Sequence, residues 1–376
     1  MVIKKKKNYF PRNVGENMKE KKDRILFNYF IIGFEIFIFI CLEGMIYPVR
    51  NTDEYYWGGY QYFSFICLVL LIMIIYKIVQ TISLKKGDSI MEYVTLSNGL
   101  KMPMVGFGVF RVPDKKECEE SVYQAIKAGY RLIDTAAAYY NEDAVGTAVK
   151  KAIAEGICTR EDLFITSKLW LQDYGYENAK KGIETSLKLL GVDYIDLYLL
   201  HQPYGDYLGA WKALEEAYQE GKIKSIGISN ITVNLWNKFK NGMTVMPAVN
   251  QVEFNPFVQQ KELRKVMAEN NIRLEAWHPL GHGNKELLEN ETIVELAKKY
   301  NKNAGQIILR WIYQEGVISL PKSTNEERMK GNIDIFDFEL TDEEMKNMQA
   351  LDTNKPSHNP EDPANETRLM GLKIHD

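Results

Sequence analysis

Four residues that could together reduce a carbonyl group follow short apolar runs in the sequence. Asp134 lies in RLIDTAAAYYNED, Tyr139 comes five residues later, Lys168 lies in LFITSKLW and His201 in IDLYLLHQP. A phenol is a poor proton donor at neutral pH unless a nearby cation stabilises the phenolate. Lys168 is the candidate cation, and Asp134 would hold it charged and oriented. His201 would orient the carbonyl oxygen while Tyr139 protonates it and a nicotinamide cofactor supplies hydride to carbon.

Each of these residues also has an ordinary structural interpretation, since a lone Asp, Lys or His at a strand end is more often structural than catalytic. Their common location favours chemistry, because each follows a strand-like run that precedes a helical pattern. The chain has eight such runs, at residues 104–108, 132–134, 163–168, 195–201, 225–229, 248–252, 273–277 and 317–321. Eight strand and helix units predict the α/β class and a (β/α)8 TIM barrel, whose active site lies at the carboxyl ends of the strands.

From about Met91 to Asp376 the chain resembles the aldo-keto reductases. The motifs that carry the resemblance are GYRLIDTAAAYYNEDAVG, LFITSKLW, DLYLLHQP, IKSIGISN, PAVNQVEFNP and LPKSTNEERMKGNI, in this order. The resemblance implies the barrel fold and a catalytic set of four residues: Asp134, Tyr139, Lys168 and His201. Tyr139 is preferred over Tyr140 because it lies five residues after the aspartate. HQP and EAWHPLG are most similar to the microbial diketogluconate and glyoxal reductase branch.

The same resemblance implies NADPH/NADP+ as the cofactor. Three polar residues match positions that bind the nicotinamide carboxamide, Ser229, Asn230 and Gln251, and Trp277 matches the aromatic residue on which the ring stacks. Lys322, Ser323 and Arg328 resemble the group that binds the adenosine 2′-phosphate, with Asn332 close to the adenine. Two cations and a hydroxyl suit a dianionic phosphate, which favours NADPH over NADH.

Substrate recognition is less well specified, because in this fold it depends on variable loops. We expect His201, Trp170, Phe107 and Phe110 to form the substrate site, with aromatic walls suited to small aldehydes and ketones of the keto-sugar, glyoxal or methylglyoxal type. His278 departs from the family pattern, where a serine is usual in the loop over the pyrophosphate. An imidazole there could contact phosphate or could be a surface residue without a role.

Residues 1–90 do not resemble the family. Residues 1–24 form a basic tail, and 25–84 predict a two-helix transmembrane hairpin with apolar runs at 25–46 and 62–79. Basic flanks on both sides would place the catalytic domain, 91–376, in the cytoplasm. Glu35 within the first run argues against spanning. Alternatives are a monotopic helix pair, a cap on the barrel, or a true translation start at Met91, which would make the protein soluble and cytoplasmic.

Composition is consistent with one large globular domain and an additional segment. The 376 residues are 45% hydrophobic and 26% charged, and the net charge of −3 argues against nucleic acid as a partner. The four cysteines have no metal-ligand spacing and no zinc signature is visible, so we expect no metal. The barrel is expected to be monomeric. A second functional class stays open, a membrane-associated NADP(H)-binding, redox-sensing accessory subunit, as in the potassium-channel β subunits that share this fold.

Overall fold

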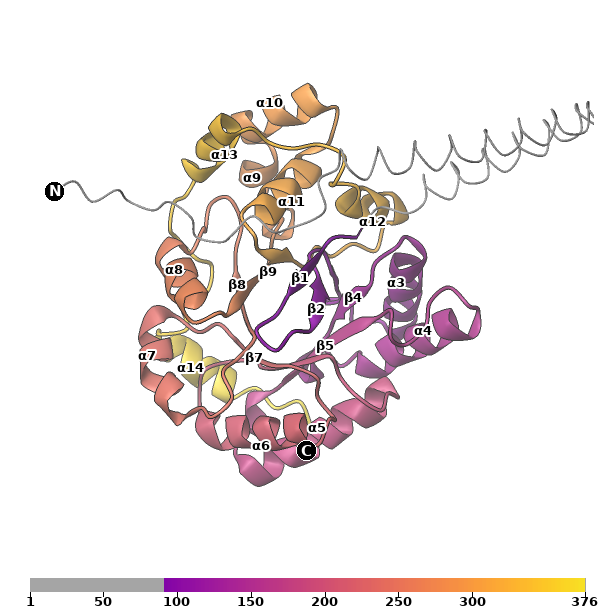
Figure 1. Ribbon diagram of the computed structural model, residues 1–376, viewed down its shortest axis with the longest axis vertical. Coiled ribbons are helices and arrows are strands. Elements are labelled where there is room, and N and C mark those ends of the chain that lie inside the picture. Colours follow the sequence, from indigo (N-terminus) through magenta and orange to yellow (C-terminus); the bar gives the residue numbers. More distant parts are fainter. Residues whose placement is uncertain (1–90, 376) are drawn as a thin grey trace, which may run out of the picture. The chain divides into compact units, whose positions relative to one another are not determined.

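A computed structural model describes residues 91–375 of the chain (Figure 1). The predicted basic tail (1–24) and membrane hairpin (25–84) lie outside the described residues. None of the helices within residues 91–375 has both the length and the hydrophobicity of a membrane span.

Eight parallel strands form one sheet, in the sequence order β3 to β10. The strands are β3 (Phe107–Gly108), β4 (Leu132–Asp134), β5 (Phe164–Leu169), β6 (Leu197–Leu200), β7 (Ile226–Ser229), β8 (Val249–Glu253), β9 (Arg273–Trp277) and β10 (Ile318–Ser319). The sheet closes on itself, because Val105 pairs in parallel with Ser319, and Gly106 N donates to Ser319 O at 2.8 Å. The predicted (β/α)8 barrel is confirmed, and every predicted strand overlaps an observed one.

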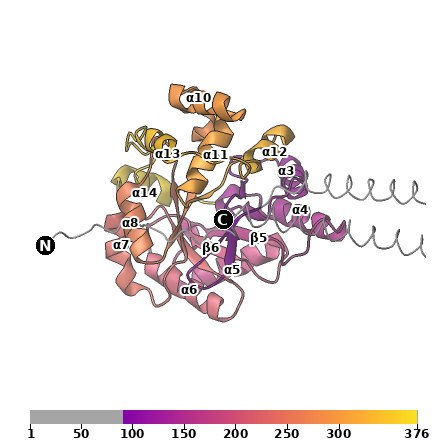
Figure 2. The same cartoon turned by 45° about the horizontal axis from the view of Figure 1, so that its top comes forward.

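Helices surround the sheet, as Figures 1 and 2 show from two directions. They are α3 (Lys115–Lys127), α4 (Glu142–Ala154), α5 (Tyr176–Leu190), α6 (Tyr207–Gln219), α7 (Val233–Phe239), α8 (Lys261–Glu269), α9 (Lys285–Leu288), α10 (Glu291–Tyr300), α11 (Ala304–Gln314), α12 (Glu326–Ile333), α13 (Asp342–Gln349) and α14 (Pro363–Met370). Several of these helices begin at a residue whose side chain accepts a hydrogen bond from a backbone N–H of the first turn. In α11, for example, Asn303 and Gln306 form a reciprocal capping box that satisfies donors at the helix start.

A hairpin precedes the barrel, formed by β1 (Tyr93–Thr95) and β2 (Lys101–Pro103), which pair antiparallel. Gly99 in its turn has a φ of 87°, which a residue with a side chain rarely adopts. Met102 of the hairpin packs in the same apolar cluster as Leu197 and Val249 from the barrel strands. The hairpin therefore covers one end of the barrel interior.

The carboxyl ends of the strands form the opposite end of the barrel, and the polar interior residues gather there. Asp134 ends β4, Ser229 ends β7 and Trp277 ends β9. Below this layer the interior is apolar, with Leu132, Leu199 and Ile318 in one cluster. An apolar layer beneath the charged groups excludes water, and the exclusion of water strengthens the electrostatic interactions between those groups.

Candidate active site

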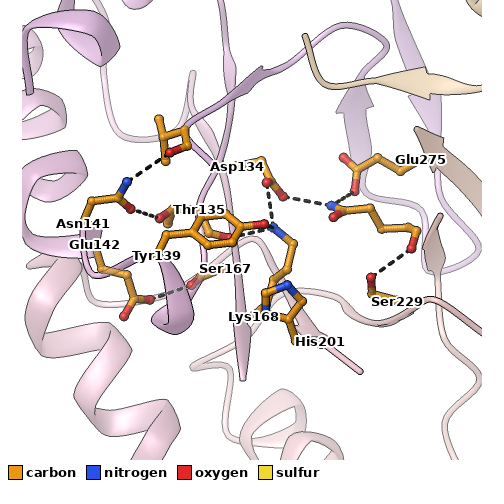
Figure 3. A network of polar contacts seen from close by, with 12 residues as sticks. Asp134, Thr135, Tyr139, Asn141, Glu142, Ser167, Lys168, His201, Ser229 and Glu275 are labelled. Atoms are coloured by element: carbon orange, nitrogen blue, oxygen red, sulfur yellow. Dashed lines mark hydrogen bonds and ion pairs between the residues drawn. The ribbon is translucent and has the colours of Figure 1, made fainter. Parts of the chain in front are cut away.

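Lys168 and Asp134 form a fully enclosed ion pair at the centre of the site (Figure 3). Lys168 is 0% exposed, and its Nζ donates to Asp134 Oδ1 at 2.7 Å and to the Thr135 carbonyl at 2.9 Å. Burial alone would lower the pKa of Lys168, but the adjacent Asp134 carboxylate outweighs it, so the pKa is raised. Lys168 is therefore a charged ammonium at neutral pH, as the sequence predicted.

Tyr139 lies beside that ammonium. Lys168 Nζ donates to the Tyr139 hydroxyl at 3.3 Å, and it also lies 4.8 Å from the centre of the phenol ring. Burial raises the pKa of Tyr139, and Lys168 counteracts part of that rise. Lys168 therefore lowers the pKa of Tyr139, as expected, but by less than burial raises it. Tyr139 is consequently protonated at neutral pH and has a cation in place for the phenolate that would form when it donates its proton.

Buried Asn141 holds the turn that carries Tyr139, the short 3-10 helix η1 (Ala137–Tyr139). Asn141 Nδ2 donates to the carbonyls of Val109 and Val112, both at 3.1 Å, and its Oδ1 accepts from Thr135 Oγ1 at 2.8 Å. The sequence did not single out Asn141. An amide directly after YY, at the start of a helical pattern, was the available signal, but it is equally typical of an ordinary helix cap.

His201 follows β6 and is a neutral imidazole. Burial and then the charge of Lys168 lower its pKa well below the usual histidine range. Its ring meets the Tyr139 and Trp170 rings edge to face, at centroid distances of 5.6 and 5.2 Å. His201 Nδ1 is buried and has no hydrogen-bond partner among the described residues. This location next to the phenol fits the predicted role of orienting a carbonyl oxygen.

The four residues predicted to hold the nicotinamide lie on the adjoining strand ends. Trp277 Nε1 donates to Asn230 Oδ1 at 2.9 Å, Asn230 Nδ2 donates to the His201 carbonyl at 3.3 Å, and Ser229 Oγ donates to the Gln251 carbonyl at 2.9 Å. Asn230 has a left-handed backbone with a φ of 59°, which asparagine tolerates better than most residues. These bonds fix the edge of the site between β7 and β9.

Gln251 has its side-chain amide oriented by two carboxyl groups. Its Nε2 donates to Asp134 Oδ2 at 2.9 Å and to Glu275 Oε2 at 2.7 Å. Both amide hydrogens are thereby used, and Gln251 Oε1 accepts no hydrogen bond within the described part of the chain. The oxygen is left as the free acceptor, which matches the amino group of a nicotinamide carboxamide.

Glu275 is the second member of the site that the sequence did not predict. It lies in β9, two residues before Trp277, and is 0% exposed. Burial and then the charge of Asp134 raise the pKa of Glu275 to about 8. The signal for it was an acidic residue inside the run RLEAW at the same strand parity as Trp277, which places both side chains on one face.

The residues predicted for the adenosine phosphate lie around the start of α12. Ser323 Oγ accepts from Asn325 N at 3.0 Å, and Asn325 caps the helix by accepting from Arg328 N. Lys322 and Arg328 make no ion pair with any residue in the described range. Two uncompensated cations beside a helix start form a suitable environment for a phosphate dianion.

The structure contradicts one of the four residues predicted to form the substrate site. Phe110 is 45% exposed and lies 5.0 Å from Tyr139 between ring centroids, while Trp170 contacts His201. Phe107 does not line the substrate site, because it is buried and packs edge to face on Tyr130. Strand alternation is the reason. Gly106 faces the interior, where an added Cβ would lie 2.5 Å from Leu132, so its neighbour Phe107 points outward to the helices.

His278 is not a surface residue. Its backbone has a φ of 63°, its Nδ1 lies 3.3 Å from Glu253 Oε1, and its ring lies 3.7 Å from that of His282 between centroids. Burial, then His278 and Arg111, lower the pKa of His282 to about 4. The side chain of His278 is engaged with Glu253, and whether it reaches phosphate stays a prediction.

Comparisons with known proteins agree with this geometry. Residues 104–353 match the Aldo/keto reductase family. The chain is 48% identical over 264 residues to a glyoxal reductase of Bacillus subtilis, covering 70% of this chain and 94% of the relative. It is also 48% identical over 261 residues to an uncharacterized oxidoreductase of the same organism, YtbE, covering 69% and 92%.

A solved structure with the same fold is the Bombyx mori aldo-keto reductase in complex with NADP. It is 36% identical, covers 73% of this chain and 96% of that chain, and superposes with a TM-score of 0.68. At this identity, the similarity extends to the sequence as well as the fold.

Proposed function

The chain belongs to the aldo/keto reductase family of oxidoreductases, and from that premise we propose that it reduces small aldehydes and ketones with NADPH. The observation that carries the proposal is the contact of one enclosed ammonium with both a carboxylate and a phenol. Lys168 Nζ lies 2.7 Å from Asp134 Oδ1 and 3.3 Å from the Tyr139 hydroxyl.

The proton chemistry follows from those contacts. NADPH, when bound, supplies a hydride to the carbonyl carbon. The neutral His201 donates a hydrogen bond to the carbonyl oxygen from one of its ring nitrogens. Tyr139 transfers its proton to the same oxygen as negative charge develops there. Lys168 then stabilises the resulting phenolate, and solvent returns the proton to Tyr139 afterwards.

The donors and acceptors of the site fit the cofactor. Gln251 Oε1 is free to accept from the carboxamide amino group, because Asp134 and Glu275 hold its Nε2. Trp277 offers an aromatic face whose orientation is fixed by the bond to Asn230. Lys322 and Arg328 supply two positive charges for the 2′-phosphate, which supports NADPH over NADH. The similar Bombyx mori enzyme is in complex with NADP.

For the substrate, we propose a small carbonyl compound of the keto-sugar, glyoxal or methylglyoxal type. The 48% identity to a glyoxal reductase supports this class. Aromatic rings also support it, because Trp170 and Tyr139 contact the neutral imidazole of His201 and Phe110 contacts Tyr139.

The test is NADPH oxidation by the full chain with methylglyoxal, compared with Tyr139→Phe. Removal of the proton donor should lower kcat by about 10²–10⁴-fold while NADPH still binds. Tyr140→Phe is the matched control, because Tyr140 is adjacent but 58% exposed, and its activity should be unchanged. Tight NADPH binding without turnover of any small aldehyde would instead support the accessory-subunit alternative.

We also propose that residues 25–84 attach the barrel to a membrane, with the basic segment 1–24 and the barrel on the cytoplasmic side. The support is the pair of apolar runs at 25–46 and 62–79 and their basic flanks. Fractionation of cells expressing the full chain or the segment 91–376 tests this. Recovery of both in the soluble fraction would contradict it.

A further inference from the structure

Glu275 is a buried acid directly adjacent to the catalytic ion pair, without an ion-pair partner of its own among the described residues. Strand β9 places it in register with Gln251 on β8, and both side chains face the barrel interior. One nitrogen, Gln251 Nε2, joins Glu275 Oε2 at 2.7 Å to Asp134 Oδ2 at 2.9 Å (Figure 3). Glu275 Oε1 is buried and has no hydrogen-bond partner among residues 91–375.

The charges around Glu275 come from several elements. Asp134 on β4 repels a second carboxylate, and Lys168 on β5 attracts it. A negative charge on Glu275 in turn raises the pKa of Tyr139 on η1. His201, after β6, is neutral. The single cation is already paired with Asp134 at 2.7 Å. An ionised Glu275 would therefore be a second anion without its own cation in a dry interior, which strongly favours the neutral acid.

We propose that Glu275 is a positioning residue of the reaction: as a neutral acid it leaves the field of Lys168 available to Tyr139, and as an anion it makes Tyr139 hold its proton more tightly. This inference rests on the proposed carbonyl reduction. Glu275 touches neither the reacting atoms nor the phenol, and acts through Gln251 and the electrostatic field shared with Asp134.

The consequence concerns the direction of the reaction. Reduction needs Tyr139 as an acid, whereas oxidation of the alcohol needs the phenolate as a base. At alkaline pH, where phenolate begins to form, Glu275 is ionised and opposes it. Glu275 therefore delays the onset of oxidation to higher pH and makes the enzyme a better reductase than dehydrogenase.

The test compares the wild-type chain with Glu275→Gln, in which the side-chain oxygen can still accept from Gln251. The measurement is the pH dependence of NADP+-linked alcohol oxidation. The midpoint of the rise should fall by about one pH unit in the variant. KM for NADP+ should not change, because the bond that orients Gln251 is kept. An unchanged midpoint in an active variant overturns the inference.

A second readout needs no cofactor. An acid whose pKa is raised in the folded state adds stability below its ordinary pKa, and this stability is lost as pH rises to about 8. The thermal midpoint of the wild type should therefore fall over this interval more steeply than that of Glu275→Gln. Glu344→Gln is the control: the carboxylate lies on α13, and its pKa is about 2, so its removal should not produce this change.

The two readouts separate the possible failures. A wild-type protein that turns over no carbonyl compound contradicts the proposed function, while the thermal comparison still tests whether Glu275 is neutral when buried. If Glu275→Gln does not fold, Glu275→Met serves as the second variant without an ionisable group. Failure of both to fold would assign Glu275 to the scaffold and overturn the inference.

Discussion

Trp277 and Asn230 are joined by a hydrogen bond between two strands that are not neighbours. The indole nitrogen donates to Asn230 Oδ1 at 2.9 Å, from β9 to the end of β7, with β8 between them. The bond passes over the strand that carries Gln251. It fixes the plane of the indole ring relative to the free acceptor of that residue, so the two groups proposed to hold the nicotinamide keep a fixed relative orientation.

Trp277→Phe should weaken NADPH binding by about 3–10-fold. The variant keeps an aromatic face but loses the bond to Asn230, whose worth is about 1 kcal/mol. Titration of the fluorescence of NADPH itself measures the effect, since the loss of a tryptophan does not disturb that signal. Asn230→Ala should produce a loss of similar size, and the double variant should lose less than the sum, because both remove the same bond. Additive losses would contradict this coupling.

Lys168→Met should abolish turnover and also destabilise the fold by about 3–5 kcal/mol, because it leaves the Asp134 carboxylate buried without its cation. Chemical denaturation measures the free energy of unfolding. The double variant Lys168→Met with Asp134→Asn removes the unpaired charge, and we expect it to recover much of the stability without recovering activity. A double variant no more stable than Lys168→Met would disprove the buried pair as the source of the loss.

His201 should stay neutral at pH values where an ordinary histidine is charged. Because burial and Lys168 lower its pKa, the folded state binds this proton less readily than the unfolded state. The associated stability is present above the ordinary histidine pKa and is lost as pH falls below it. His201→Gln, a neutral replacement, should be less sensitive to acid unfolding than the wild type. The chemical shifts of the ring nitrogens report the charge state directly, and an imidazolium signal near neutral pH would be incompatible with this assignment.

Most of the candidate catalytic residues could be predicted from the sequence. Strand periodicity placed Asp134, Lys168 and His201 at strand ends. The resemblance to the aldo-keto reductases selected Tyr139, through its five-residue interval from the aspartate. The prediction for Phe107 was wrong because a glycine lies on each side of it. Gly106 and Gly108 have no side chains, so the sequence does not indicate which face of the strand points inward. Glu275 and Asn141 were missed for a different reason. Their importance comes from contacts across the sheet, to Gln251 in one case and to Val109 and Val112 in the other, and such contacts have no local signature.

Asn141→Ala should lower kcat while leaving NADPH affinity unchanged. The variant leaves two buried carbonyls and the Thr135 hydroxyl without their partner, at a cost of about 1–3 kcal/mol, and frees the turn that holds Tyr139 beside Lys168. Steady-state kinetics and NADPH titration separate the two effects. Equal losses in cofactor binding and turnover would indicate general unfolding and not displacement of the phenol.

Arg328→Ala and Lys322→Ala should each reduce the preference for NADPH over NADH. Neither side chain has an ion-pair partner in residues 91–375, so each charge is available to the 2′-phosphate and its removal leaves no buried carboxylate behind. The fold should therefore be unaffected. We expect Kd for NADPH to rise about tenfold for Arg328, whose planar guanidinium can bind phosphate through two donors, and less for Lys322. Kd for NADH is the internal control and should not change, because NADH has a hydroxyl where NADPH has the phosphate. A parallel rise for both cofactors would mean that these residues hold the adenosine end in general and do not select the phosphate.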